Sequence, residues 1–539
     1  MNSSSFVPPE KTGSQQVVPD NASGTASSPR PPSRDPSLAT NARFWLYLGF
    51  FALVLVPLGI HMGPRTFFFS FITFLEVVFL FNILIIVHEL GHYLAARWCG
   101  LKIDKFAIWF GKPIWSKKID GIEYILGSVP AGGFVALPQM APMEAIEGKT
   151  DTPKEELPPA SPGQKIVVAF AGPLFSFGLA LVFAAIVWVV GKPVTDTEAT
   201  TTIGYVLPDS PADHAHLQPG DRVLSIDHHP VTRFGGIGDS IMWRIISSTA
   251  PSIPIEVERD GQKLSVEVTP KVEEHAFWQR SMPRRIGIAP AHEALIVKKV
   301  VPYSPAAMAG IGPKDQITAL NGQKLYDYDP ILLQLKNHPN DPVHLTVLQQ
   351  GATKELTLQP EKPISPKDLP KDGPQTDIGI EELQPVVTIV YLNPLVQVGE
   401  SVQSIVGTLQ ALFTPHSTVG ASQLSGPVGI MYIFFAVLSS PDGWKLALWL
   451  AVVINVNLAL FNLFPFPVLD GGHILLSIIE WIRRRPLSMT ILEPLQTACG
   501  LLLISYMLYV TFFDVQDTGR MAMSLGADQE IKFAPKPAP

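Results

Sequence analysis

Five long apolar runs constrain the fold of this chain more than any other feature of its sequence. They cover residues 44–60, 67–98, 166–190, 444–463 and 495–513. An α-helix needs roughly 17 to 25 apolar residues to cross the hydrocarbon core of a bilayer. Because lipid cannot satisfy backbone polar groups, such runs fold as helices. We therefore expect a multi-span α-helical membrane protein with soluble regions between its spans.

The second run ends in the sequence His88-Glu89-Leu90-Gly91-His92. Ionisable side chains at the end of a membrane segment are costly and usually serve a functional site. Residues four apart share one face of a helix, so His88 and His92 can bind the same metal ion. Glu89 is then placed to contact a water molecule bound to that ion. The alternative is a pair of hydrogen-bonded histidines at a helix end.

A third metal ligand is expected at Asp470, the first acidic residue after the fourth run. It lies in the sequence NLFPFPVLDGG, residues 462–472. Pro465 and Pro467 cannot continue a helix, so the chain should unwind just before Asp470. Unwound backbone at membrane depth is tolerated only where protein buries it or where it lines a wet cavity. Since a catalytic zinc site has three protein ligands and one open position, the two motifs predict one shared site. Alternatively, Asp470 only caps the helix that follows it.

Together, HELGH and NLFPFPVLDGG resemble the site-2 protease family of intramembrane zinc metalloproteases. The closest likeness is to its bacterial branch, the regulator of sigma-E proteases, which carries two periplasmic PDZ domains. The resemblance runs from about residue 67 to residue 513 and includes SGPVGI at residues 425–430. It implies one Zn²⁺ per chain, bound by His88, His92 and Asp470, with Glu89 as general base. It also implies that Asn462 binds the substrate backbone, and we assign substrate binding to Pro465 and Pro467 beside it.

One position departs from the family pattern. The second core span of these proteases reads A-G-P-x-x-N, whereas residues 171–176 read AGPLFS here. Ser176 can donate a hydrogen bond but reaches less far than asparagine. We therefore do not transfer the family's role for this amide to Ser176.

Basic residues predict the orientation of the chain in the membrane. They cluster before the first run, after the second, and between the fourth and fifth, at Arg30, Arg34, Arg43, Lys102, Lys105, Lys112, Lys117, Lys118, Arg483, Arg484 and Arg485. By the positive-inside rule these three regions are cytoplasmic. The metal motifs then face the cytoplasmic side of a bacterial inner membrane, and the region between residues 195 and 436 is periplasmic.

The resemblance implies a four-helix protease core, to which this chain adds one N-terminal span. We expect the core in two halves, residues 67–191 and 444–513. Residues 1–43 are rich in Ser and Pro and predict a disordered cytoplasmic tail, and residues 44–61 an uncleaved anchor. The remaining expected parts are a linker and periplasmic membrane-proximal region and a flexible tail, at residues 363–443 and 514–539.

An internal repeat in the periplasmic region predicts two PDZ-like α+β domains, at residues 195–285 and 286–362. The sequence SPA followed by LQPGDRVLSI, ending at residue 226, recurs as SPA followed by IGPKDQITAL, ending at residue 320. PDZ domains bind extended peptides by adding a strand to a sheet edge. We expect the first domain to bind peptides or substrate ectodomains through the loop Ile203, Gly204, Tyr205 and Val206. The alternative is that both domains are steric plugs.

Residues 103–137 alternate like strands and contain several glycines. In a protease this stretch would form a membrane-embedded hairpin whose open edge pairs with an unwound substrate. We therefore assign substrate binding to Gly132 and Gly133.

The sequence thus predicts a zinc-dependent intramembrane endopeptidase that cleaves transmembrane segments of single-span proteins. Its expected partners are such substrates and the lipid bilayer, and no nucleic acid. The resemblance suggests anti-sigma factors and remnant signal peptides as substrates. One alternative is a catalytically silent PDZ-bearing scaffold, whose structural zinc would need a fourth protein ligand such as His473. The other is a metal-ion transporter, which should carry further ligands across the bilayer, where the runs offer only Glu76.

Overall fold

The computed structural model describes residues 63–140, 157–272, 278–364, 373–415, 417–485, 487–527 and 531–535. The chain divides into two compact units, residues 1–69 and 70–539. All sheets and the candidate site described below lie in the second unit. The expected tail and anchor, residues 1–43 and 44–61, lie outside the described residues.

Within the described ranges, five segments are long and apolar enough to cross a membrane: Pro64–Trp98, Pro162–Val190, Ala421–Leu438, Gly443–Asn462 and Leu492–Arg520. Four of them match the expected runs, in α2 (Pro64–Trp98), α4 (Pro162–Val190), α12 (Gly443–Asn462) and α14 (Met489–Ala527). A capping box starts α4: the Ser161 side chain accepts from the Gln164 N–H, and the Gln164 side chain accepts from the Ser161 N–H.

Small residues bring α4 and α12 close together. Ala180 and Ala184 of α4 are buried in one cluster with Ala447 and Ala451 of α12. Small side chains let helix backbones approach within a membrane, where packing rather than hydrophobicity drives association. This close pair positions the two halves of the core.

The apolar segment Ala421–Leu438 was not among the runs expected as spans. It lies within residues 363–443, the expected linker and periplasmic membrane-proximal region. It comprises η3 (Ala421–Gln423) and α11 (Pro427–Leu438), with Phe434 fully buried against the core. The helix α11 has 12 residues, which at 1.5 Å per residue gives about 18 Å. The whole segment of 18 residues meets the length for a span, but α11 alone is shorter than the hydrocarbon thickness of about 30 Å. Pro427 in the first helical turn favours the start of α11 at this position.

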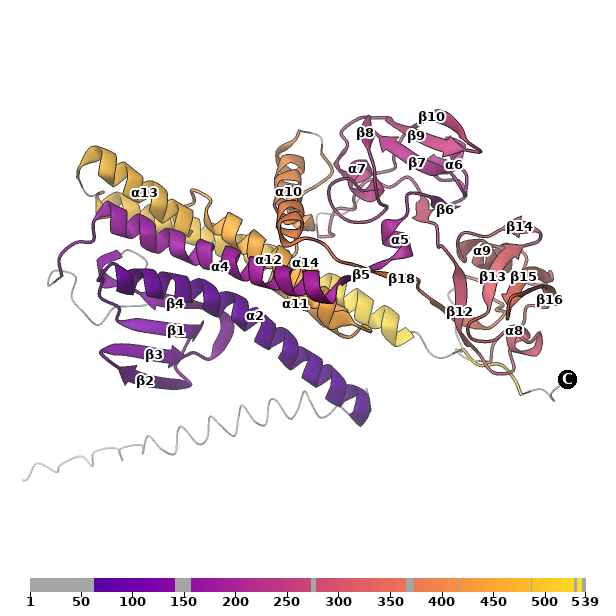
Figure 1. Cartoon of the computed structure of the whole chain (residues 1–539), viewed down its shortest axis with the longest axis horizontal. Helices are drawn as coiled ribbons and strands as arrows, with labels where there is room; N and C mark the ends of the chain where they lie inside the picture. The colour runs from indigo at the N-terminus through magenta and orange to yellow at the C-terminus, as the bar shows by residue number, and fades with distance from the viewer. Residues whose placement is uncertain are drawn as a thin grey trace, which may run out of the picture. The chain divides into compact units, whose positions relative to one another are not determined.

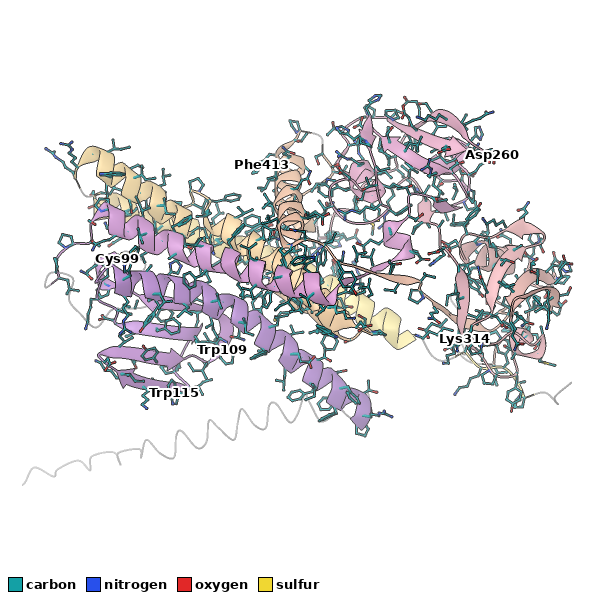
Figure 2. The ribbon with its side chains drawn as sticks, in the orientation of Figure 1. Cys99, Trp109, Trp115, Asp260, Lys314 and Phe413 are labelled. Carbon is teal, nitrogen blue, oxygen red and sulfur yellow. The ribbon has the colours of Figure 1, made fainter. Side chains whose placement is uncertain are left out.

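The predicted strands in residues 103–137 are present. They form a sheet of order β2-β3-β1-β4, made of β1 (Lys105–Phe110), β2 (Trp115–Ile119), β3 (Ile122–Leu126) and β4 (Val129–Ala136) and followed by η1 (Pro138–Met140). This sheet lies beside α2 (Figure 1), and the Trp109 indole N–H donates to the Asn82 side chain on that helix. Trp109 and Trp115 mark the sheet in Figure 2. Because β4 pairs only with β1, its other edge is an outer edge of the sheet.

The first soluble sheet system surrounds a core of aliphatic residues that includes Ile203, Ile226 and Ile255. Its elements are α5 (Asp196–Ala199), β6 (Ile203–Val206), α6 (Pro211–His214), β7 (Arg222–Ile226), β8 (His229–Pro230), α7 (Ile241–Ser247), β9 (Ile253–Arg259), β10 (Gln262–Val268) and β11 (Ile288–Pro290). The expected hairpin is β9 and β10, joined at Asp260 and Gly261, both with positive φ. The last strand, β11, lies beyond the expected boundary at residue 285 because it pairs back onto β6.

The second soluble sheet has order β16-β15-β13-β12-β17 and its own core. Its elements are β12 (Leu295–Val300), α8 (Pro305–Met308), β13 (Gln316–Leu320), β14 (Gln323–Lys324), α9 (Asp329–Asn337), β15 (Val343–Gln349), β16 (Ala352–Leu358) and β17 (Ile380–Gln384). The strand β17 lies in the range expected as linker, but it pairs with β12, so the sheet extends past residue 362.

Two short strands connect this soluble region to the helices. The strand β5 (Lys192–Thr195) directly follows α4, and it pairs antiparallel with β18 (Val387–Val390), which precedes α10 (Pro394–Phe413). The register runs from Lys192 opposite Val390 to Thr195 opposite Val387. The chain therefore leaves and rejoins the helical core at one place.

Within residues 514–527 and 531–535, the described part of the expected flexible tail, the structure shows ordered contacts. The helix α14 continues to Ala527, and Phe533 beyond it is only 4% exposed. Asp514 on this helix is also buried, where its carboxylate accepts from Arg280 and from the N–H groups of Gly426 and Gly429 at the start of α11. Tertiary contacts of this kind cannot be predicted from the composition of the segment.

Candidate metal centre

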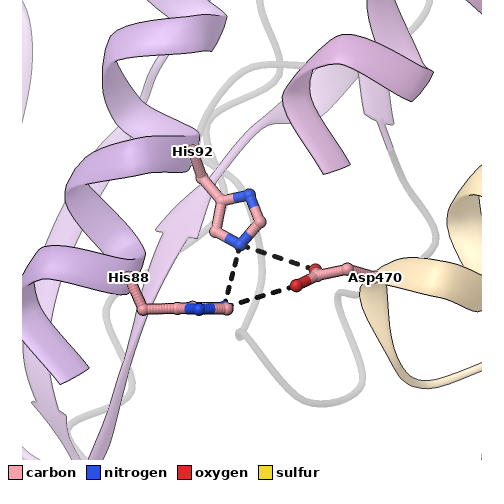
Figure 3. Close-up of side chains that lie close together, drawn as sticks. All are labelled: His88, His92 and Asp470. Atoms are coloured by element: carbon pink, nitrogen blue, oxygen red, sulfur yellow. Dashed lines mark hydrogen bonds and ion pairs between the residues drawn. The ribbon is translucent and has the colours of Figure 1, made fainter. Parts of the chain in front are cut away.

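The three expected ligands lie together although 377 residues separate the second histidine from the aspartate in the sequence. His88 and His92 project from α2, and Asp470 begins α13 (Asp470–Arg483). The Nε2 atom of His88 lies 3.3 Å from one Asp470 oxygen, and that of His92 lies 3.5 Å from the other. The two Nε2 atoms are 3.2 Å apart, and Figure 3 shows the three side chains pointing toward one another. The predicted proximity is confirmed, because all three ligand atoms lie within 4.8 Å of one another.

A break in the helical chain presents Asp470 to the histidines. The helix α12 ends at Asn462, and α13 starts at Asp470 after the proline-containing turn. Gly471 and Gly472 let this turn fold tightly: a Cβ added to them would lie 2.1 Å from the Leu463 carbonyl oxygen and 2.0 Å from that of Phe466. The unwinding expected before Asp470 is therefore present, and the two glycines permit it.

Residues of α4 orient the two imidazoles. His92 Nδ1 lies 2.8 Å from the Val168 carbonyl oxygen, and His88 Nδ1 lies 3.0 Å from the Ser176 hydroxyl. A carbonyl can only accept, so His92 Nδ1 carries the proton and Nε2 keeps its lone pair for a ligand. Partners on the second ring nitrogen commonly fix the orientation of metal-binding histidines. Ser176 thus contacts the site, although its comparison with the asparagine of the family pattern gave it no role.

The local space and the donor set fit a zinc ion. A Cβ added to Gly172 would lie 2.2 Å from His92 Nε2 and 2.9 Å from His88 Nε2, so the absence of a side chain keeps this volume open. One carboxylate oxygen of Asp470 is buried without a hydrogen bond donor. Two imidazole nitrogens and one carboxylate oxygen are a usual ligand set for catalytic zinc.

The remaining predicted site residues lie around this cluster. A Cβ on Gly133 would be 3.1 Å from Glu89 Cγ, so β4 passes directly beside the Glu89 side chain. Gly132 has a φ of +124° and faces the ring of Phe110. The Asn462 side-chain nitrogen lies 3.5 Å from His88 Nε2.

The two prolines of the break are placed differently from each other. Pro465 is exposed, whereas the carbonyl of the partly buried Pro467 accepts from the Gln496 side chain of α14 at 3.3 Å. Glu76 is exposed on α2, 12 residues before His88, or about 18 Å along the axis. In the described part of the chain, the metal-type cluster consists of His88, His92 and Asp470 and does not include His473.

The peptide loop expected in the first soluble sheet system forms the strand β6. Ile203 bonds to the backbone of Gly220 and Asp221 on one side, and β6 pairs with β11 on the other. A Cβ on Gly204 would lie 2.4 Å from the Pro290 carbonyl oxygen. The strands β6 and β11 thus form a two-stranded sheet, in which Ile203 also bonds to the segment before β7. Peptide binding by Ile203, Gly204, Tyr205 and Val206 stays a prediction.

Comparison with known proteins agrees with this geometry. The model of peptidase family M50 matches residues 76–506. Protease RseP of Yersinia pestis is 30% identical over 437 residues, which cover 76% of this chain and 90% of the relative. Regulator of sigma-E protease RseP of Escherichia coli is 28% identical over 424 residues, with the same two coverages of 76% and 90%. A Neisseria meningitidis protein named as a zinc metalloprotease is 27% identical over 460 residues, 82% of this chain and 98% of its own. The resemblance read from HELGH and LDGG is confirmed, and the chain is a multi-pass membrane protein that belongs to peptidase family M50.

Proposed function

We propose that this chain is a zinc-dependent intramembrane endopeptidase that hydrolyses peptide bonds in the transmembrane segments of single-span proteins. The observation that carries the proposal is the gathering of His88, His92 and Asp470 within 4.8 Å, from two apolar segments distant in sequence. A polar cluster of this kind is costly at membrane depth and is maintained where it serves chemistry.

The residues have distinct roles in hydrolysis. His88, His92 and Asp470 would hold the zinc ion, which supplies an activated water and polarises the scissile carbonyl when bound. Glu89 takes a proton from the attacking water and passes it to the nitrogen of the breaking C–N bond, so that the amine leaves neutral. Val168 and Ser176 keep the imidazoles turned toward the ligand position.

The outer edge of β4 is the proposed substrate platform. A helical substrate must unwind before hydrolysis, and an open strand edge replaces the backbone hydrogen bonds that it loses. Gly132 and Gly133 keep side chains away from this edge, and Gly133 lies next to Glu89. Asn462, whose side-chain nitrogen lies 3.5 Å from His88 Nε2, would bind the same backbone from the other half of the core.

The orientation of the protein follows from its charges. Arg483 ends α13 and is followed by Arg484 and Arg485 ahead of α14, and five lysines lie between Trp98 and Ile119. Both regions are cytoplasmic by the positive-inside rule, which places the site on the cytoplasmic side of a bacterial inner membrane. The two soluble sheet systems are then periplasmic and exclude substrates with bulky ectodomains. Anti-sigma factors and remnant signal peptides are candidate substrates by analogy with the sigma-E regulators.

Three protein ligands, rather than four, distinguish this proposal from a silent zinc-binding scaffold. A structural zinc site fills its fourth position with protein. The cluster found among the described residues supplies three ligands, which leaves a position for water. The transporter alternative gains no support, since Glu76 lies exposed and well away from the cluster.

The deciding experiment measures cleavage of a model transmembrane substrate in detergent, together with bound zinc by mass spectrometry. Glu89→Gln should keep zinc and lose cleavage, because it removes the base and no ligand. The matched control is Glu76→Gln, the same change at an exposed position of the same helix, which should cleave normally. Cleavage by Glu89→Gln at the rate of the unmodified chain would exclude this mechanism.

A further inference from the structure

The two soluble sheet systems contain the same loop, which leads into the last strand of each. In the first, the carbonyl of Gly287 accepts from the Leu207 N–H, and in the second the carbonyl of Gly379 accepts from the Val301 N–H. Both glycines have positive φ, and a Cβ on either would clash with a serine, Ser210 or Ser304, that caps a short helix. The two loops therefore correspond residue by residue.

The two loops carry side chains of opposite charge at the position two residues before each glycine. That position is Arg285 in the first loop and Asp377 in the second, and each forms an isolated β-bridge, with Lys271 and with Glu361. The Asp377 carboxylate accepts the Gly379 N–H at 2.5 Å. Turns that expose backbone N–H groups attract anions, including the carboxyl ends of peptides. In the second loop, a carboxylate of the chain itself already bonds to such a group.

The C-terminal segment, residues 531–535, lies against this second loop. Phe533 is only 4% exposed, while its neighbours Lys532 and Ala534 are exposed. A Cβ on Gly379 would lie 3.3 Å from the Phe533 ring, and the Ile364 N–H donates to the Lys532 carbonyl at 2.8 Å. A short segment with one buried aromatic residue and a backbone hydrogen bond has the features of a docked peptide.

We propose that residues 531–535 are an intramolecular ligand of the second soluble sheet, with Phe533 as the anchor at the loop formed by residues 377–380. The tether favours this contact over free peptides, because a linked segment is present at an effective concentration on the order of millimolar. The second sheet is thus occupied by the chain's own C-terminal segment, whereas the corresponding loop of the first carries Arg285. The segment also links the end of α14 to the second sheet.

The test is hydrogen–deuterium exchange of the full chain in detergent. The probe is the Ile364 amide, which bonds to the docked segment, and the reference is the Val301 amide, which bonds to Gly379 within the sheet. Phe533→Asp should speed exchange at Ile364 at least tenfold and leave Val301 unchanged. The matched control, Ala534→Asp, adds the same charge at an exposed position and should leave both amides protected. Equal exchange at Ile364 in Phe533→Asp and the unmodified chain would overturn the proposal.

A second variant covers the case in which Phe533→Asp disturbs the whole sheet. The chain is ended at Ala527, and a synthetic peptide of residues 528–539 is added. Protection of Ile364 should return with the unmodified peptide and stay absent with the peptide carrying Phe533→Asp. Failure of the unmodified peptide to restore protection at millimolar concentration would also overturn the proposal. All measurements can use the Glu89→Gln background, so their outcome does not depend on the proposed proteolysis.

Discussion

Gly172 offers a sharp test of the metal centre, because it touches the site without being a ligand. Alanine at this position would place a methyl carbon 2.2 Å from His92 Nε2, where ordinary contacts begin at 3.4 Å. The imidazole or α4 must then move by about 1.2 Å. Metal–ligand distances tolerate roughly 0.2 Å, and a displacement of about 1 Å can cost 100-fold in rate. We therefore expect Gly172→Ala to lower zinc affinity at least tenfold and cleavage at least 100-fold.

The matched control is Gly178→Ala, six residues further along α4. A Cβ there meets nothing within 4 Å, so both changes share the gain in helix propensity of about 1 kcal/mol and only one adds a clash. Zinc affinity is measured by competition with a chromogenic chelator, and cleavage with the model transmembrane substrate. If Gly172→Ala binds zinc and cleaves like Gly178→Ala, the space beside His92 does not belong to a metal site.

Further changes test the surroundings of the site and of the second sheet. Ser176→Ala should weaken zinc binding about tenfold by freeing the His88 ring, and an unchanged chelator competition curve would argue against a role for this hydroxyl. Gly133→Ala should reduce cleavage about tenfold with zinc retained, because its Cβ would lie 3.1 Å from Glu89 Cγ and 2.9 Å from a backbone carbonyl; loss of zinc instead would indicate a structural effect. Burial raises the pKa of the Asp377 carboxyl. The contribution of this group to the free energy of unfolding is therefore greatest at low pH and is lost as pH rises from the unfolded pKa through the raised folded pKa. Asp377→Asn should therefore stabilise the second sheet at pH 7 more than at pH 4, as measured by urea unfolding, and destabilisation at pH 7 would contradict this reasoning.

The centre of the site could be predicted from sequence because its signals are local. The spacing of His88 and His92 defines one helix face, and the prolines before Asp470 define a break in the next membrane segment. Ser176 was assigned no role, because residue type gives side-chain reach but not the distance between helices. In the structure α4 lies close enough to α2 for the shorter hydroxyl to reach His88 Nδ1 at 3.0 Å.

The parts that sequence could not predict depend on pairing between distant segments. The strands β11 and β17 pair with the first strand of their own sheets, 82 and 80 residues earlier in register, at Val206 with Ile288 and Val300 with Ile380. The same pairing joins Ile203–Val206 to β11 in a two-stranded sheet, a contact that the sequence of this loop does not indicate. Phe533 sits in a polar, proline-containing segment whose composition resembles a flexible tail, and its burial depends on a loop more than 150 residues away.

The paired strands β5 and β18 form the covalent neck of an inserted region, residues 196–386. Thr195 and Val387 are register partners, so a tight turn could replace the 191 residues between them without altering the path from α4 to α10. The root of the neck is fixed to the core, since Lys192 is buried with its ammonium 4.0 Å from the ring centre of Trp449 on α12. Replacing this region would keep the covalent path through the core, but it would remove the Arg280 partner of Asp514 on α14 and the sheet against which Phe533 packs.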